Sequence, residues 1–243
     1  MTKHKYKLSI ITATYNAIEH LPKLIECLQN QTDKDFEWVV ADGASTDGTL
    51  ELLESTKDLN IVITSEEDFG IYDALNRGIR HSNGEFYLIM GADDLLYSNA
   101  VKDYKNAIED KLDIITATIK IGDRMSKAGQ RGGSWFAAQF AYVSGHAVGS
   151  IYRKSLHEKH GYYSRKFPIA ADQLFVLKAC KDGARVKKID VLAGEFWGGG
   201  VSHEDVIGSM TEHYRVQLNI SENKFLQTIL FILRLIKNYG KIN

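Results

Sequence analysis

The sequence predicts an α/β protein with a mainly parallel central sheet, helices on both faces of that sheet and a helical extension at the C-terminus. Two observations support this fold class. Short β-prone runs alternate with segments of helical apolar spacing through about residue 110, and residues 209–241 carry a further helical pattern. Alternation of this kind is typical of βαβ units, whose strands run parallel beneath covering helices.

The expected elements follow in chain order. Strands are predicted at 8–14, 36–41, 61–64, 85–90, 113–121 and 186–192. Helices are predicted at 18–31, 49–56, 71–81, 170–182 and 209–241. Within 71–81, Ile71, Leu75 and Ile79 recur every four residues, which is the spacing of one helix face. Residues 122–133 are expected to form an exposed loop.

Composition limits the function classes. The 243 residues are 44% hydrophobic, which allows a sizeable core, and the net charge of -1 gives no reason to expect a nucleic-acid partner. Cys27 and Cys180 lack metal-ligand spacing, so we expect free thiols in a reducing compartment. The basic start of the chain is followed by only a short apolar run, so no secretion signal is predicted and a cytoplasmic location is expected.

Polar side chains gather where the predicted strands end. They are Thr12, Thr14, Asn16, Asp42, residues 65–68, Asp93 and Asp94. In open α/β sheets, ligands bind beyond the carboxyl ends of the strands. The sequence therefore predicts one polar crevice at this edge of the sheet.

Asp93 and Asp94 form a carboxylate pair directly after a buried strand. Adjacent carboxylates repel each other, and Mg²⁺ or Mn²⁺ is a natural partner because hard cations prefer oxygen ligands. The alternative is that one of them caps a helix that begins near Leu95.

Four stretches together resemble family 2 glycosyltransferases of the GT-A fold. They are residues 9–16 (SIITATYN), 39–49 (VVADGASTDGT), 67–78 (EDFGIYDALNRG) and 91–94 (GADD). They occur in the family's order and spacing, and the similarity becomes thinner from 96 to 205. The resemblance implies a GT-A domain at 1–210, with a nucleotide-binding half at 1–95 and an acceptor-side half at 96–210, followed by an apolar helical tail at 211–243.

The resemblance also implies roles for the strand-end residues. Thr12, Thr14 and Asp42, with Asn16 beside them, would hold the base and ribose of the nucleotide. The segment with Asp73, Asn76 and Arg77 would lie against the nucleotide and sugar, although Arg77 could instead be a solvated surface charge.

The family's metal motif reads Asp-x-Asp, whereas this chain has Gly91 at the first position. Asp93 and Asp94 are therefore both candidate ligands, with Asp94 slightly favoured for the metal and Asp93 also near the ribose. His203, after a run of glycines, is a candidate third metal contact.

Sugar transfer needs a base that takes the proton from the acceptor hydroxyl. Asp172, at the start of the helix predicted at 170–182, corresponds to the acid that the family places there, and the alternative is another helix cap. His146 could contact the acceptor or the donor sugar, or serve the core. Trp135 and Trp197 could stack on sugar rings or pack in the core.

The tail from Phe225 to Lys237 is apolar almost all round, with Lys224, Arg234, Lys237 and Lys241 in and around it. It is too short to span a bilayer. Peripheral contact with the inner face of the cell membrane and a protein-covered role, as an oligomer interface or a helix on the core, are equally favoured.

We therefore expect an inverting, metal-dependent glycosyltransferase that uses Mn²⁺ or Mg²⁺. A UDP-sugar is the expected donor, and a glycan or lipid-linked glycan of surface polysaccharide synthesis is the expected acceptor. The alternatives are a nucleotidyltransferase, which would want a Gly-rich phosphate loop after the first strand, and a non-catalytic nucleotide-sugar-binding module.

Overall fold

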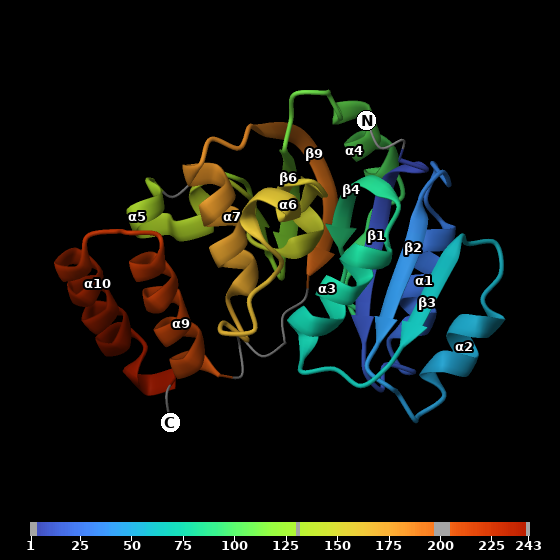
Figure 1. The fold of residues 1–243 in the computed structure, drawn as a ribbon, viewed down its shortest axis with the longest axis horizontal. Helices are drawn as coiled ribbons and strands as arrows, with labels where there is room; N and C mark the ends of the chain where they lie inside the picture. Colours follow the sequence, from blue (N-terminus) through green and yellow to red (C-terminus); the bar gives the residue numbers. More distant parts are fainter. Residues whose placement is uncertain (1–3, 130–131, 197–204, 242–243) are drawn as a thin grey trace.

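The computed structural model describes residues 4–129, 132–196 and 205–241. Its centre is a mixed sheet of nine strands within these ranges, in the order β3-β2-β1-β4-β8-β6-β9-β5, with β7 paired to β6 (Figure 1). The strands are β1 (Tyr6–Thr14), β2 (Glu37–Asp42), β3 (Ile61–Ser65), β4 (Gly84–Ile89), β5 (Leu95–Leu96), β6 (Ile114–Ile121), β7 (Arg124–Ser126), β8 (Ser150–Arg153) and β9 (Val186–Phe196).

The sheet divides into two halves that follow the chain. Strands β3, β2, β1 and β4 pair in parallel, so their carboxyl ends meet at one edge. Strand β8 runs antiparallel to both β4 and β6, and β9 is parallel to β6. The predicted parallel sheet is therefore present as far as β4, and the second half is mixed because the chain no longer alternates strand with crossover helix there.

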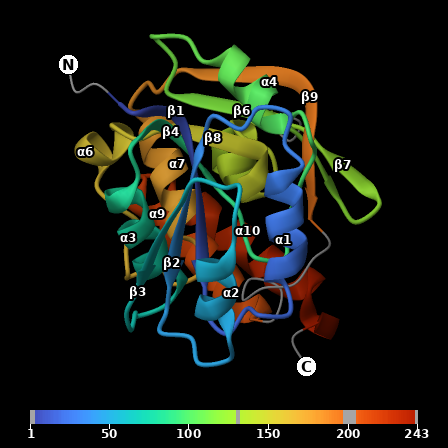
Figure 2. The same cartoon turned by 90° about the vertical axis from the view of Figure 1, so that its right-hand side faces the viewer.

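Helices cover both faces of the sheet, as predicted. One face packs under α1 (Leu21–Gln29), α2 (Thr49–Ser55) and α4 (Ala100–Ala107), and the other under α3 (Ile71–His81), α6 (Leu156–His160) and α7 (Ala171–Lys181). Neighbouring residues of β1 pack on opposite faces of the sheet. Ile10 packs in the core under α1, α2 and α4, and Ile11 packs in the core under α3, α6 and α7, which is the period-two alternation of a strand buried on both faces. Figure 2 shows the two helix layers on either side of the strands.

The C-terminal segment forms two helices, α9 (Val206–Asn219) and α10 (Lys224–Lys237), where a single helical segment was predicted. The break has a local cause, because Ser221 adopts a left-handed backbone with φ 64° and Asn223 caps α10 by accepting the backbone N–H of Leu226 at 3.0 Å. Helix α9 lies between α7 and α10, and α10 is outermost (Figure 1).

Three strands and two helices were not predicted, and all of them are short: β5, β7 and β8, together with α5 (Ser134–Ala137) and α6. Helix α4 was also missed, because only four of its eight residues are apolar or aromatic and two of those are alanines. The predicted loop at 122–133 contains β7, which forms a hairpin with β6. In the described ranges no helix is both long enough and apolar enough to cross a membrane. Cys27 and Cys180 are free, as expected.

Candidate active site

The carboxyl ends of β1, β2 and β3 meet at Asp42, which is fully buried. Its Oδ1 accepts the hydroxyls of Thr14 (2.9 Å) and Ser45 (2.5 Å), and its Oδ2 accepts the backbone N–H of Ser45 and the hydroxyl of Ser65. Burial alone would raise the pKa of Asp42, but these hydrogen bonds outweigh it and hold the pKa below its usual value. Asp42 is therefore ionised, and its hydrogen bonds hold together the ends of β1 and β3 and the loop after β2. Its contact with a nucleotide stays a prediction, because one of these donors would have to turn away from the carboxylate.

Two other strand-end residues differ in accessibility. The Thr12 side chain is fully buried and its hydroxyl accepts the indole N–H of Trp38 at 3.0 Å, so the structure does not bring this side chain to the strand-end crevice. Asn16 is exposed and has a left-handed backbone, with φ 47°. Its Oδ1 accepts the backbone N–H of Thr46, and its own N–H donates to Ser45, so it ties the loop after β1 to the loop after β2.

Sequence reasoning missed the approach of both Tyr15 and Asp68 to Gly43. A Cβ on Gly43 would lie 2.8 Å from Asp68 Oδ2 and 3.3 Å from Tyr15 Cδ2, so the glycine permits both side chains to approach the end of β2. Asp68 Oδ1 accepts the backbone N–H of Gly70. The available signal was Asp68 itself, two residues before Gly70, the glycine that precedes α3. This acid was quoted for the family resemblance but given no role.

The three predicted residues of α3 have different roles. Arg77 is 7% exposed, donates to the carbonyl oxygen of Asp42 and pairs with Glu66 at 3.3 Å, so its interpretation as a solvated surface charge is wrong. Asn76 is buried and brackets Tyr163, donating to its carbonyl oxygen at 2.8 Å and accepting its N–H at 2.9 Å. The amide of Asn76 is therefore occupied within the protein.

Asp73 pairs with Arg165 and accepts the backbone N–H of Phe69. Burial opposes ionisation of Asp73, but these two hydrogen bonds outweigh it and keep its pKa below the usual value. Asp73 and Arg77 line the same surface hollow near the start of α3, together with Glu66 and Arg165. That hollow does not include the carboxylate pair after β4.

Asp93 and Asp94 lie in a tight turn between β4 and β5. Because a strand follows, the helix-capping alternative for the pair is wrong. Asp93 is exposed, whereas Asp94 is 5% exposed and accepts the backbone N–H of Gly91 at Oδ2 (2.6 Å). A Cβ on Gly91 would lie 3.0 Å from Asp93 Oδ1 and 3.1 Å from Asp94 Oδ2, so the position where the family has an acid is filled by these two carboxylates.

Two buried polar atoms face each other at this turn. Asp94 Oδ1 and His146 Nδ1 lie 3.7 Å apart, too far for a hydrogen bond, and neither has a partner within the described residues. Burial raises the pKa of Asp94 to about 7, and burial lowers the pKa of His146 to about 4. The imidazole is thus neutral at physiological pH and stacks on Phe196 with ring centroids 4.0 Å apart.

These orphaned atoms bear on the divalent metal that the resemblance implies. A carboxylate oxygen and a neutral imidazole nitrogen without other partners are suitable donors for Mn²⁺ or Mg²⁺, and an uncompensated buried carboxylate is costly without a cation. The residues present therefore fit a metal at Asp94. No cluster of three or more His, Cys, Asp or Glu ligands occurs in 4–129, 132–196 and 205–241. His203 and Trp197 lie outside the described residues.

Asp172 lies in the first turn of α7, where Tyr72 of α3 donates its hydroxyl to Asp172 Oδ1 at 2.7 Å. Burial raises the pKa of Asp172, and the Tyr72 hydrogen bond partly opposes that shift. The negative charge of Asp172 favours the protonated form of His146, but burial outweighs this effect and the pKa of His146 stays low.

Asp172 does not cap α7, so that alternative is also wrong. The cap comes from Glu212 of α9, a buried residue whose Oε2 accepts the backbone N–H groups of Ile169 (3.0 Å) and Ala170 (2.9 Å). Sequence reasoning missed Glu212, because nothing in the local pattern links an acid in α9 to a helix that begins 40 residues earlier. Asp172 is thereby left free to face the site.

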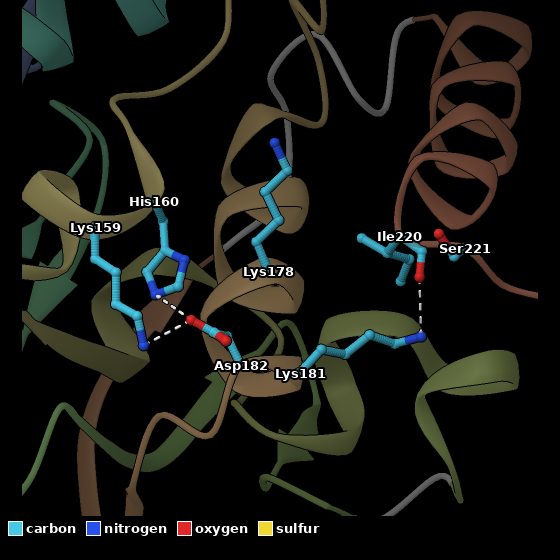
Figure 3. A pocket seen from close by; sticks show the side chains of 7 residues that line it. All are labelled: Lys159, His160, Lys178, Lys181, Asp182, Ile220 and Ser221. Atoms are coloured by element: carbon cyan, nitrogen blue, oxygen red, sulfur yellow. Dashed lines mark hydrogen bonds and ion pairs between the residues drawn. The ribbon is translucent and has the colours of Figure 1, made fainter.

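A second concavity, between α6, α7 and the end of α9, is an ion-paired surface (Figure 3). Asp182 points toward Lys159, at 2.6 Å, and toward His160. Lys181 points the other way and donates to the carbonyl oxygen of Ile220 at 3.2 Å. None of the predicted site residues lines it.

The chain has the GT-A fold, which it shares with solved structures of glycosyltransferases. Staphylococcus aureus TarS in complex with UDP-GlcNAc has this fold, with a TM-score of 0.69 at 22% identity over 96% of this chain and 73% of that one. The mannosyltransferase PcManGT from Pyrobaculum calidifontis, in complex with GDP-Man and Mn²⁺, has a TM-score of 0.69 at 20% identity over 98% and 76%. At these identities the similarity establishes the fold alone.

The family model described as Glycosyl transferase family 2 matches residues 9–178, so the chain belongs to that family. A PGL/p-HBAD biosynthesis glycosyltransferase of Mycobacterium bovis is 40% identical over 92 residues, 37% of this chain and 36% of the relative. The poly(ribitol-phosphate) beta-N-acetylglucosaminyltransferase TarS of Staphylococcus aureus is 27% identical over 193 residues, 74% of this chain and 33% of the relative. The chain thus spans about a third of the length of these curated relatives. Family membership favours the predicted glycosyltransferase over the nucleotidyltransferase alternative.

Proposed function

We propose that this glycosyltransferase moves a sugar from a UDP-sugar to a hydroxyl of a glycan or lipid-linked glycan, with inversion at the anomeric carbon and with a divalent metal. The observation that carries the proposal is the site at the end of β4. There Asp94 and His146 present two buried, unpartnered atoms 3.7 Å apart.

The donor class is inferred from relatives. Solved structures of TarS hold UDP and UDP-GlcNAc, and PcManGT holds GDP-Man with Mn²⁺. The PcManGT structure thus contains a divalent cation together with its nucleotide sugar. In this chain Asp94, with Asp93, would hold Mn²⁺ or Mg²⁺, which supplies positive charge to the departing diphosphate. Asp94 is the better direct ligand because it is buried and has a free oxygen, whereas Asp93 is exposed.

Asp172 is the proposed base. Its carboxylate takes the proton from the acceptor hydroxyl as the oxygen bonds to the anomeric carbon, and the bond from that carbon to the diphosphate breaks with its electron pair on the leaving oxygen. Tyr72 holds the carboxylate by its hydrogen bond to Oδ1. A single displacement of this kind inverts the anomeric centre. His146, as a neutral imidazole, is positioned to contact the sugar or the acceptor.

A donor screen with Mn²⁺ or Mg²⁺ tests the proposal, with released nucleoside diphosphate as the readout. We expect Asp94→Ala to abolish metal-dependent UDP binding. We expect Asp172→Asn to keep UDP binding and to lose turnover by at least about a hundredfold. Asp190→Asn, at an exposed acid that pairs with Lys127 at 3.7 Å, is the matched control and should behave as wild type. If Asp172→Asn also lost UDP binding, the base assignment would be wrong.

A further inference from the structure

Helix α10 has an apolar face that no described part of the chain covers. The side chains of this face are exposed, from 40% for Ile229 to 78% for Phe225, and they recur at helical spacing along one side of α10: Phe225, Ile229, Ile232, Leu233 and Ile236. We refer to these five residues as the α10 face. A contiguous exposed stripe of large apolar side chains marks an interaction surface on a folded protein.

The opposite side of α10 is already fixed to the protein. Gln227 is buried and donates to the carbonyl oxygen of Trp135, and Arg234 donates to the carbonyl oxygen of Phe136. Tyr214 of α9 hydrogen bonds with Thr228 at 2.9 Å, and its ring stacks on Phe231. The prediction that the tail packs on the core is therefore right for one side of α10. The exposed stripe is the other side.

The charged residues of α10 and of the segment after it all have one sign. Lys224 and Lys237, at the two ends of the helix, are exposed, and residues 223–241 contain neither Asp nor Glu. The short helix α5 beneath α10 carries no charge, and Glu212 of α9 is buried at the N-terminus of α7. The surface that complements this face is apolar beneath a layer of negative charge.

A second copy of the chain does not fit this charge pattern. In an antiparallel pair of α10 helices, Lys224 of each copy would lie beside Lys237 of the other. In a parallel pair each lysine would lie beside itself. Either arrangement places like charges at both ends of an apolar contact, with no acid on the helix to compensate.

We infer that the α10 face binds the surface of an anionic lipid bilayer, with the helix lying in the plane of the interface. The five apolar side chains enter the boundary between headgroups and acyl chains, while Lys224 and Lys237 meet acidic headgroups at either end. The inference concerns a surface distant from the carboxylates of the site and does not depend on which donor or acceptor the enzyme uses.

Vesicle co-sedimentation of the full chain tests the inference without donor, acceptor or metal, so a failure here is separate from a failure of the proposed activity. The vesicles contain phosphatidylcholine alone or phosphatidylcholine with phosphatidylglycerol. We expect binding to the anionic vesicles that weakens as salt is added, and little binding to the neutral ones.

Two variants separate the contributions. The double variant Ile232→Ser, Ile236→Ser should lower partition into anionic vesicles by at least about tenfold, because both side chains lose their apolar contact. The double variant Lys224→Gln, Lys237→Gln should lower it roughly tenfold for anionic vesicles only. Met125→Ser, which changes an exposed apolar side chain on β7, is the matched control and should bind as wild type.

Three results would overturn the inference. The first is equal binding to neutral and anionic vesicles. The second is binding that the Ile232 and Ile236 substitutions leave unchanged. The third is a concentration-dependent dimer in analytical ultracentrifugation that these substitutions dissociate, without vesicle binding by the wild type. Circular dichroism spectra that match the wild type would show that the variants are folded.

Discussion

Replacing Tyr72 by Phe tests the role of Asp172 most directly. The Tyr72 hydroxyl donates to Asp172 Oδ1 at 2.7 Å, and burial raises the pKa of Tyr72 well above 10, so the phenol keeps its proton throughout the working range of pH. A hydrogen bond from a neutral donor to a charged acceptor contributes about 1.5–3 kcal/mol. Because one pKa unit corresponds to about 1.4 kcal/mol, losing this bond should raise the pKa of Asp172 by about one to two units.

The sign of the effect on activity follows from the base role. Asp172 must be ionised to accept a proton, so activity falls as the pH drops through its pKa, and Tyr72→Phe should move the acidic limb of the kcat profile to higher pH. Well above that limb, kcat should change little. Metal and donor are kept saturating, so that bound metal holds Asp94 ionised and its titration does not enter the profile.

The matched control is Tyr104→Phe. Tyr104 is also a fully buried tyrosine whose hydroxyl donates to a backbone carbonyl, that of Val148, at 2.9 Å. The control loses a comparable hydrogen bond and has no contact with Asp172, so its acidic limb should stay where the wild type has it. An unmoved limb in Tyr72→Phe, or an equal shift in both variants, would refute the assignment of Asp172 as the base held by Tyr72.

Three further predictions concern the metal turn and the scaffold. The pKa of metal-free Asp94 is about 7, so protons compete with Mn²⁺ for its carboxylate below that pH. The apparent affinity for Mn²⁺ should therefore fall about tenfold per pH unit below 7. Calorimetry that finds the same affinity at acidic and alkaline pH would contradict this. Gly91→Ala places a Cβ against the carboxylates of Asp93 and Asp94 and should weaken Mn²⁺ binding roughly tenfold; electron paramagnetic resonance titration that finds unchanged affinity would show that the turn adapts. Asn76→Ala leaves the N–H and carbonyl of Tyr163 without partners and should lower the free energy of unfolding by about 2–4 kcal/mol in urea titrations. A variant as stable as wild type would show that these two hydrogen bonds do not stabilise the fold.

Local patterns in the first half of the chain were strong enough to predict its elements closely. Helix α3 has the predicted bounds, 71–81, because its apolar residues repeat on one face and glycine precedes it. Strands β1, β2 and β4 follow the same logic, since each is a mostly buried run rich in apolar residues, whereas β3 is only half-buried. The second half was harder because β5 has only two residues and β7 only three, which is too short for any periodicity.

The sequence could single out candidate residues of the site, but it could not predict which other groups of the protein they contact. Residue type and position singled out Asp94 and Asp172, and the family resemblance gave them roles. That Asn76 would bracket Tyr163, 87 residues away, depends on a loop that carries no pattern of its own. Likewise, the burial of Arg77 follows from the approach of its guanidinium to the carbonyl of Asp42, a backbone group that the sequence does not reveal as an acceptor.

The cap that Glu212 provides has a practical consequence for anyone who shortens this protein. The segment that matches the family ends at residue 178, inside α7, and suggests a natural place to trim. Yet the two N–H groups at the start of α7 are satisfied only from residue 212, in a helix outside that segment. A fragment cut at residue 178 would keep every assigned acid but would lose Glu212. The backbone at the start of the helix that carries Asp172 would then no longer be held in place.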